Sequence, residues 1–135
     1  MDLTSTFSYD IFLRLCVAML LGLAIGAERI YAHKAAGMRT YAMVAMGASL
    51  FIIISQVVAA VYSGSGAGID PLRMASQIIV GVGFLGSGLI IFKNDKISGI
   101  TTASGLWVAA GIGMAAGFGL YGLAIMTTLV TLFIF

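Results

Sequence analysis

The chain has 135 residues, of which 61% are hydrophobic and 9% are charged, and its formal net charge is +2. Soluble domains are about half apolar and about a quarter charged, so this composition excludes a soluble globular protein and indicates an integral membrane protein. The seven basic residues are scattered along the chain without interleaved aromatic residues, which argues against a nucleic-acid-binding surface.

Five apolar segments follow one another along a single domain that spans residues 1–135. A bilayer crossing takes about 20 apolar residues, so we expect an all-α fold with five transmembrane helices. We interpret the first segment as a retained span, because no basic region precedes it and no small-residue cleavage site follows it. The predicted helices cover residues 9–27, 40–62, 72–92, 101–116 and 120–135.

The distribution of charge predicts the orientation of these helices. Residues 28–39 and 93–99 hold five of the seven basic residues, whereas residues 63–69 hold none. Because basic loops stay on the cytoplasmic side, we expect the amino terminus outside and the carboxyl terminus in the cytoplasm. Tyrosines near the expected boundaries fit headgroup-level anchors: Tyr9, Tyr62 and Tyr121 outside, and Tyr31 and Tyr41 inside. The last helix ends without a polar anchor, so we expect a further cytoplasmic domain beyond residue 135.

The first apolar segment carries Arg14 followed by small residues at intervals of four. Gly22 and Gly26 form the small-xxx-small pattern that lets two membrane helices approach closely. Arg14 has two interpretations: its side chain snorkels to the outer headgroups, or it joins Arg73 in a basic vestibule that binds an anion, a lipid phosphate, or Asp70 and Asp10.

The third segment begins with Asp70, a residue that can cap a helix, followed by proline. Arg73 and Gln77 lie one turn apart, and Gly81 and Gly88 fall on the same helical face. We expect this face to point into protein. Gln77 could hydrogen-bond another helix or line a site, and these two alternatives stay open.

Residues 81–86 match the pattern G-x-G-x-x-G through Gly81, Gly83 and Gly86. No predicted strand precedes the match, which lies inside an apolar span, so we interpret these glycines as helix-packing residues and not as a dinucleotide site.

The fourth segment opens with hydroxyl side chains at Thr101, Thr102 and Ser104, which can cap the helix or attract an anion at its amino end. Its many small residues, including Gly113 and Gly117, predict close packing. The break at residues 117–119 predicts a tight hairpin to the last helix. One long helix over residues 101–135 is the alternative.

Acidic residues are too few for catalysis by paired carboxylates, so we expect no enzyme and no cofactor. The five acids are Asp2, Asp10, Glu28, Asp70 and Asp95, and none falls in mid-membrane. Mg²⁺ prefers oxygen ligands, and only Asp70 and Glu28 could serve it, at the two mouths of a path. The metal, if any, stays undetermined.

Three blocks of the sequence resemble the membrane domain of the MgtC/SapB family: residues 22–29 with 36–40, residues 70–88, and residues 99–107. The resemblance implies a bacterial inner-membrane protein associated with growth in low magnesium, acid tolerance or virulence. Members of this family are labelled magnesium transporters and also regulators of membrane machines such as ATPases. The family pattern falls on these residues: Gly26, Glu28, Arg29, Gly37, Arg39, Thr40, Asp70, Arg73, Gln77, Gly81, Gly83, Gly86, Gly88, Thr101, Thr102 and Trp107.

Two functional hypotheses therefore remain. In the first, the protein takes part in Mg²⁺ transport, with the face of Gln77 along the route. In the second, it is a regulator without transport activity that docks onto other membrane proteins through glycine-rich faces. We also expect a homodimer in the lipid bilayer, formed through one of these faces.

Overall fold

The computed structural model describes residues 3–62 and 70–135, which form five helices and one small sheet. The elements in chain order are α1 (Leu3–Tyr31), α2 (Met38–Val61), α3 (Leu72–Ser87), β1 (Ile91–Lys93), β2 (Lys96–Ser98), α4 (Ile100–Gly117) and α5 (Tyr121–Ile134). The prediction of a helical protein is confirmed. The loop 63–69, on which part of the orientation argument depends, lies outside the described residues.

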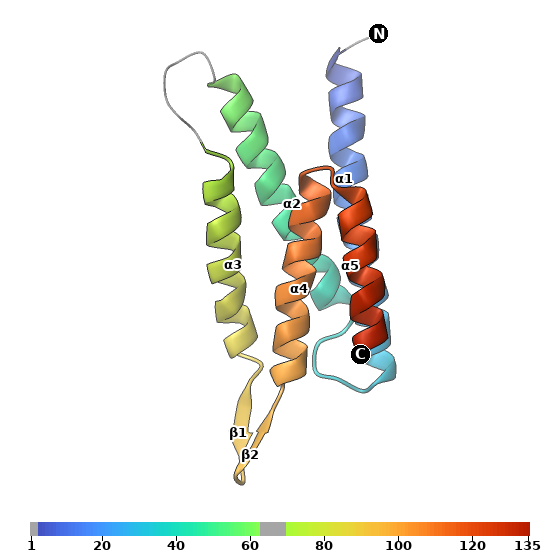
Figure 1. Cartoon of the computed structure of the whole chain (residues 1–135), viewed down its shortest axis with the longest axis vertical. Helices are drawn as coiled ribbons and strands as arrows, with labels where there is room; N and C mark the ends of the chain where they lie inside the picture. Colours follow the sequence, from blue (N-terminus) through green and yellow to red (C-terminus); the bar gives the residue numbers. More distant parts are fainter. Residues whose placement is uncertain (1–2, 63–69) are drawn as a thin grey trace.

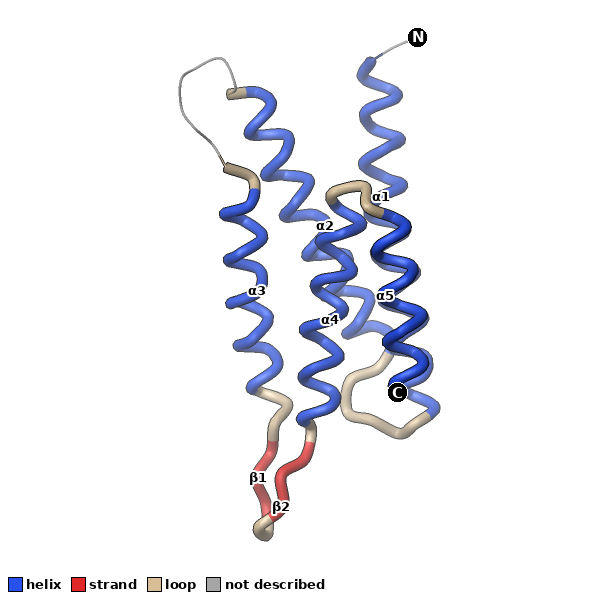
Figure 2. Tube along the Cα trace, viewed as in Figure 1, coloured by secondary structure: helices blue, strands red, loops and turns tan. Residues whose placement is uncertain are grey.

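Helix α4 lies at the centre of the molecule and packs against each of the other four helices (Figure 1). Helices α1, α2 and α5 surround one side of it, whereas α3 lies at the periphery and packs on α2 and α4. The two strands project beyond the helix ends as a separate hairpin (Figure 2). The bundle is therefore built around α4.

Three of the described helices are long and apolar enough to cross a bilayer: α1 over Ser8–Tyr31, α2 and α4. Helices α3 and α5 are apolar but have 16 and 14 residues, which gives lengths of about 24 Å and 21 Å. A hydrocarbon core is about 30 Å thick, so these two helices fall short of it on their own.

Small residues on α1 and α4 let both helices lie directly against α2. A Cβ added to Gly22 would lie 2.6 Å from the carbonyl oxygen of Tyr41, and one added to Gly26 would overlap the backbone of Met38. On α4, a Cβ at Gly113 would overlap the backbone of Ala45. Any side chain at these positions would push two helix backbones apart, so the glycines set the interhelical distance.

The turn between α4 and α5 confirms the predicted hairpin and excludes one long helix. Gly119 adopts φ +78°, a conformation that costs glycine no steric energy. The amide of Gly119 donates to the carbonyl of Ala116 at 2.9 Å, and the amide of Leu120 donates to Ala115 at 2.8 Å. This pair of bonds is the Schellman motif, which satisfies carbonyls left free at a helix end.

The third helix ends earlier than residue 92, because the chain turns back in a β-hairpin. Ile91 pairs with Ser98, and Phe92 pairs with Ile97. Asn94 and Asp95 have φ values of +51° and +58°. Two positive-φ residues between paired strands form the type I′ turn that Asn and Asp favour. The prediction of helix up to residue 92 was wrong because apolar residues suit an exposed strand as well as a span.

Candidate functional site

The most connected polar group inside the bundle is the guanidinium of Arg14, which joins three helices. Nη1 donates to Oε1 of Gln56 on α2 at 2.9 Å and to the carbonyl oxygen of Gly117 on α4 at 2.8 Å. Nη2 forms an ion pair with Oδ2 of Asp10 at 2.7 Å, one turn earlier on α1. We call Asp10, Arg14, Gln56 and Gly117 the Arg14 cluster. Of the partners expected for Arg14, the structure shows Asp10, whereas Arg73 is exposed on α3.

Unsatisfied polar atoms gather around the same region. Among the side chains that the structure describes, three buried polar atoms have no hydrogen-bond partner: Arg14 Nε, Ser49 Oγ and Tyr121 OH. The backbone of Ser49 lies against Gly117, and the Arg14 guanidinium lies beside Gly119. Buried polar groups in proteins are nearly always hydrogen-bonded, so these three atoms have unused hydrogen-bonding capacity inside the bundle.

A cavity of about 280 Å³ adjoins the Arg14 cluster between α1 and α2. Three members of the cluster line it together with apolar side chains such as Ile53 and Val57. The side chain of Asp10 is 44% exposed and that of Arg14 is 22% exposed. The cluster is therefore accessible from outside the bundle on the α1–α2 side.

A second buried charge lies toward the opposite end of α1. Arg29 is 2% exposed and bonds the carboxylate of its neighbour Glu28 through Nε. Its guanidinium stacks on the Phe135 ring at 3.6 Å from the centroid, and Nη2 lies 3.5 Å from the Phe135 carbonyl oxygen. A cation over an aromatic face is stabilised by the ring quadrupole, so this contact helps to hold α1 and the end of α5 together.

Near the buried Arg29, Tyr41 links α2 to α4. Its hydroxyl donates to the carbonyl oxygen of Thr102 at 3.2 Å, and its side chain is fully buried. Gly105 makes room for it, because a Cβ there would lie 2.5 Å from the Tyr41 hydroxyl. The expectation that Tyr41 anchors the chain at the headgroups was therefore wrong: it is a core residue that links two helices.

The face of α3 that carries Arg73 and Gln77 points away from the rest of the chain. Both side chains are exposed, whereas Ile78, Val82 and Gly86 are buried against the bundle. The expected inward orientation was therefore wrong for the single chain. Packing of α3 uses the adjacent apolar stripe at intervals of four, which lies about 100° away from the polar one.

The glycines of α3 differ in their surroundings. Gly81 and Gly83 have no neighbouring atom within 4 Å of an added Cβ. Gly86 is in ordinary contact with Ala103 of α4 at 3.5 Å, and Gly88 meets only the preceding turn of its own chain. Two of the four predicted packing glycines thus lie on open surface, where a partner could approach.

The remaining predicted residues have local roles or lie on the surface. Asp70 accepts a hydrogen bond from the amide of Leu72 at 2.9 Å at the start of α3. Ser104 donates to the carbonyl of Ile100 at 3.0 Å. Thr102 is buried and Thr101 is exposed, as are Arg39 and Thr40 at the start of α2. The structure does not bring these residues together in one site.

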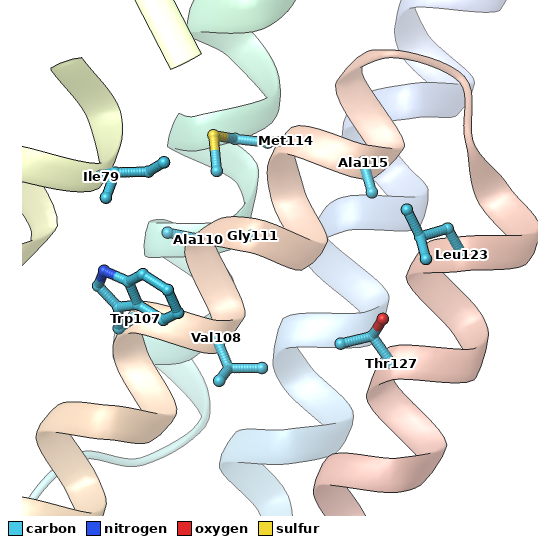
Figure 3. Close-up of a pocket in the computed structure, with 9 residues that line it drawn as sticks. All are labelled: Ile79, Trp107, Val108, Ala110, Gly111, Met114, Ala115, Leu123 and Thr127. Carbon is cyan, nitrogen blue, oxygen red and sulfur yellow. The ribbon is translucent and has the colours of Figure 1, made fainter. Parts of the chain in front are cut away.

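Two apolar hollows flank α4. One, of about 300 Å³, lies over α4 between α3 and α5, and Figure 3 shows Ile79, Trp107 and Thr127 at its walls. The other lies between α3 and the first half of α4 and shares Trp107 and Val108 with it. Nearly all lining groups are apolar, so these hollows fit hydrocarbon chains or helix side chains and not an ion.

Sequence reasoning missed Gln56, Ser49 and Phe135. Gln56 is a polar residue in an apolar helix, and the argument that singled out Gln77 applies to it equally. Nothing in the local sequence distinguishes Phe135 from the exposed Phe133. Among the described residues no group of three or more His, Cys, Asp or Glu side chains could hold a metal ion.

The model of the MgtC family matches residues 15–135 of this chain. Escherichia coli K12 has a relative, named "Putative magnesium transporter YhiD", that is 43% identical over 126 residues. Those residues cover 93% of this chain and 59% of the relative. No solved structure matches the chain.

Two further relatives show similar identity over shorter regions. An uncharacterized Haemophilus influenzae protein is 43% identical over 108 residues, which cover 76% of this chain and 45% of the relative. Protein MgtC of Salmonella typhimurium is 41% identical over 96 residues, which cover 71% of this chain and 38% of that protein. The chain thus spans roughly four to six tenths of these relatives. With a match over nearly its whole length, the chain belongs to the MgtC family.

Proposed function

We propose that this protein works in the bacterial inner membrane in magnesium homeostasis, with all five helices in the bilayer, the amino terminus outside and the carboxyl terminus in the cytoplasm. Family membership and the name of the Escherichia coli relative support the link to magnesium. The basic residues of the α1–α2 loop and of the hairpin support the orientation. In this proposal the protein performs no covalent chemistry and needs no cofactor.

The mode of action that the geometry favours is docking onto membrane proteins through the outward face of α3. The observation that carries it is the exposure of Arg73 and Gln77 on a helix of a membrane bundle. Polar side chains facing lipid are costly, so they normally face protein or water. Open space at Gly81, on the same side of the helix, would let another backbone come close.

The simplest partner is a second copy of the chain, which gives the homodimer expected from the sequence. In a two-fold contact through α3, Gln77 of each copy could hydrogen-bond the other copy, and Gly81 of the two copies would lie in the contact. An ATPase or another membrane protein is the alternative occupant of the same face.

Magnesium transport is the second candidate function. The name of the Escherichia coli relative favours it, and the Arg14 cluster supplies oxygen ligands of the kind that Mg²⁺ prefers. A transporter requires a route past the Arg14 cluster and past the buried Arg29, which lies toward the opposite end of α1. In that case Gln77 would lie on the route between copies of the chain.

One preparation tests both modes. The protein is reconstituted in liposomes, and Mg²⁺ uptake is measured with a trapped indicator for the natural chain, Gln77→Leu and empty liposomes. Uptake above that of empty liposomes that disappears in Gln77→Leu supports transport. Absence of uptake from folded protein excludes transport by this domain.

Self-association is measured in the same liposomes by cysteine crosslinking. The chain has one cysteine, Cys16, so a Cys16→Ser background carries a single new cysteine at Gly81. Docking through α3 predicts crosslinked dimers for Gly81→Cys but not for Leu129→Cys, an exposed position on α5. Equal crosslinking at both positions would contradict a specific α3 interface.

A further inference from the structure

The guanidinium of Arg14 is held by three oxygen atoms from three different helices. They are a carboxylate oxygen of Asp10, the side-chain carbonyl oxygen of Gln56 and the main-chain carbonyl oxygen of Gly117, at 2.7, 2.9 and 2.8 Å from its nitrogens. Carboxylate, amide and backbone carbonyl oxygens are also the ligands of hard divalent cations in proteins. The bundle has thus assembled a cation site, and the cation that occupies it belongs to the chain.

The site can exchange one cation for another, with Asp10 balancing one of the two charges of a divalent ion. Asp10 neutralises Arg14, and each lies on the wall of the cavity between α1 and α2. If the guanidinium moved away, the Asp10 carboxylate and the Gln56 side-chain oxygen would face this cavity, and the Gly117 carbonyl oxygen would lose its donor. The cavity, of about 280 Å³, has room for the water molecules that a divalent ion keeps as its remaining ligands.

The Arg14 side chain is able to move away from the three oxygens. Its side chain is 22% exposed and long enough to swing outward, where the charge would meet water or lipid headgroups. Its Nε has no hydrogen-bond partner among the described residues, so the guanidinium gives up only the bonds to the three oxygens. By contrast, Arg29 is 2% exposed and stacks on Phe135, so it cannot exchange in this way.

We propose that Arg14 is a tethered cation closing a three-oxygen cation site, and that a free divalent metal ion competes with its guanidinium for Asp10, Gln56 and Gly117. The tether gives the guanidinium a high effective concentration, so the natural chain holds a metal ion only weakly. As the concentration of divalent cations rises, the ion replaces the guanidinium at the three oxygens. The choice of a divalent ion rests on the proposed function in magnesium homeostasis, whereas binding is measured without any flux, so the two proposals fail separately.

The test uses Mn²⁺, a hard divalent ion with a strong electron paramagnetic resonance signal when free in solution. The protein is placed in nanodiscs of zwitterionic lipid, and the loss of free Mn²⁺ signal is followed for the natural chain and for Arg14→Met. This substitution removes the tethered charge and keeps an apolar side chain of similar length. We expect Arg14→Met to bind one Mn²⁺ with an affinity about tenfold or more above that of the natural chain. Mg²⁺ should displace it.

Arg73→Met is the matched control, because it removes the same charge from the exposed face of α3 and leaves the three oxygens unchanged. It should bind Mn²⁺ as weakly as the natural chain. Adding Asp10→Asn to Arg14→Met removes the carboxylate and should abolish the gained binding. Folded Arg14→Met that gains no Mn²⁺, or a gain that survives Asp10→Asn, would overturn the proposal.

A second variant tests the proposal if Arg14→Met does not fold. Gln56→Glu keeps Arg14 and adds a second carboxylate to the site. Competition predicts that this variant binds Mn²⁺ more tightly than the natural chain, since two carboxylates cannot both be neutralised by one guanidinium. Unchanged Mn²⁺ affinity in folded Gln56→Glu would contradict the proposal.

Discussion

Arg14 and Gly117 lie 103 residues apart in the sequence, yet the guanidinium of the first donates a 2.8 Å hydrogen bond to the carbonyl oxygen of the second. The bond ties the amino-terminal half of α1 to the last residue of α4. A side chain near the beginning of the sequence therefore satisfies a carbonyl oxygen at the α4–α5 turn. Substitutions near either residue should therefore affect the stability of the whole bundle.

The two glutamines Gln56 and Gln77 should respond differently to replacement by leucine. Gln56→Leu removes the acceptor of one Arg14 bond, and hydrogen bonds to charged groups contribute about 1.5–3 kcal/mol. We expect a loss of about that size in the free energy of unfolding, measured in detergent with increasing denaturant. Gln77→Leu, on an exposed face, should change it by less than about 0.5 kcal/mol. The reverse order of the two effects would contradict the placement of Gln56.

Two glycines of α4, only two residues apart, form a second matched pair. Gly113→Ala places a methyl group into the backbone of Ala45 and should cost about 1–3 kcal/mol, because two helices must separate. Gly111→Ala meets no atom within 4 Å and should be neutral or slightly stabilising, since alanine favours helix more than glycine does. Thermal unfolding in detergent, followed by circular dichroism, compares the two. Equal melting temperatures would show that α2 and α4 are farther apart than described.

The stacking of Arg29 on Phe135 should be visible in the same assay. Phe135→Leu keeps an apolar side chain but removes the aromatic face, with a loss of about 1–2 kcal/mol for a desolvated cation–π contact. Phe133→Leu is the control, because Phe133 is 91% exposed and lies two residues away. Its substitution should leave the melting temperature of the solubilised protein unchanged. If both variants melt at the same temperature, the stacking adds no stability.

Gly99 joins the β-hairpin to α4 in a conformation that other residues rarely adopt. Its φ is +88°, and a Cβ at this position would overlap the carbonyl oxygen of Leu89. Gly99→Ala should therefore strain the junction by about 1–3 kcal/mol. We expect increased proteolysis at the hairpin, measured by limited digestion. Gly122→Ala, where an added Cβ meets open space, should be digested like the natural chain.

Hydropathy predicted the helices because the apolar length of a segment is a local property. It failed after Ser87, since Ile91 and Phe92 are equally apolar in a strand. The signal for the turn was present in Asn94 and Asp95, a pair that favours the positive φ values of a type I′ turn. A span prediction extended to the next charge, Lys93, therefore includes most of the first strand.

The orientation of α3 could not be read from its polar residues. The argument that Gln77 must face protein is sound for a membrane helix, but it does not say whether that protein is the same chain or another one. In the single chain the buried stripe is Ile78, Val82 and Gly86. The partners of Arg14 were equally inaccessible, because Gln56 and Gly117 come close only through the packing of α1, α2 and α4.

The carbonyl oxygens at the end of α4 are satisfied within the protein. Its last four carbonyl oxygens all accept hydrogen bonds: those of Met114, Ala115 and Ala116 from backbone amides of the turn, and that of Gly117 from Arg14. Free carbonyls are what normally keep a helix end among the headgroups, since they cannot be left unpaired in hydrocarbon. Figure 1 shows the α4–α5 turn stopping short of the neighbouring end of α1. Because these four oxygens are paired, the end of α4 does not need to reach the headgroups or water to satisfy them.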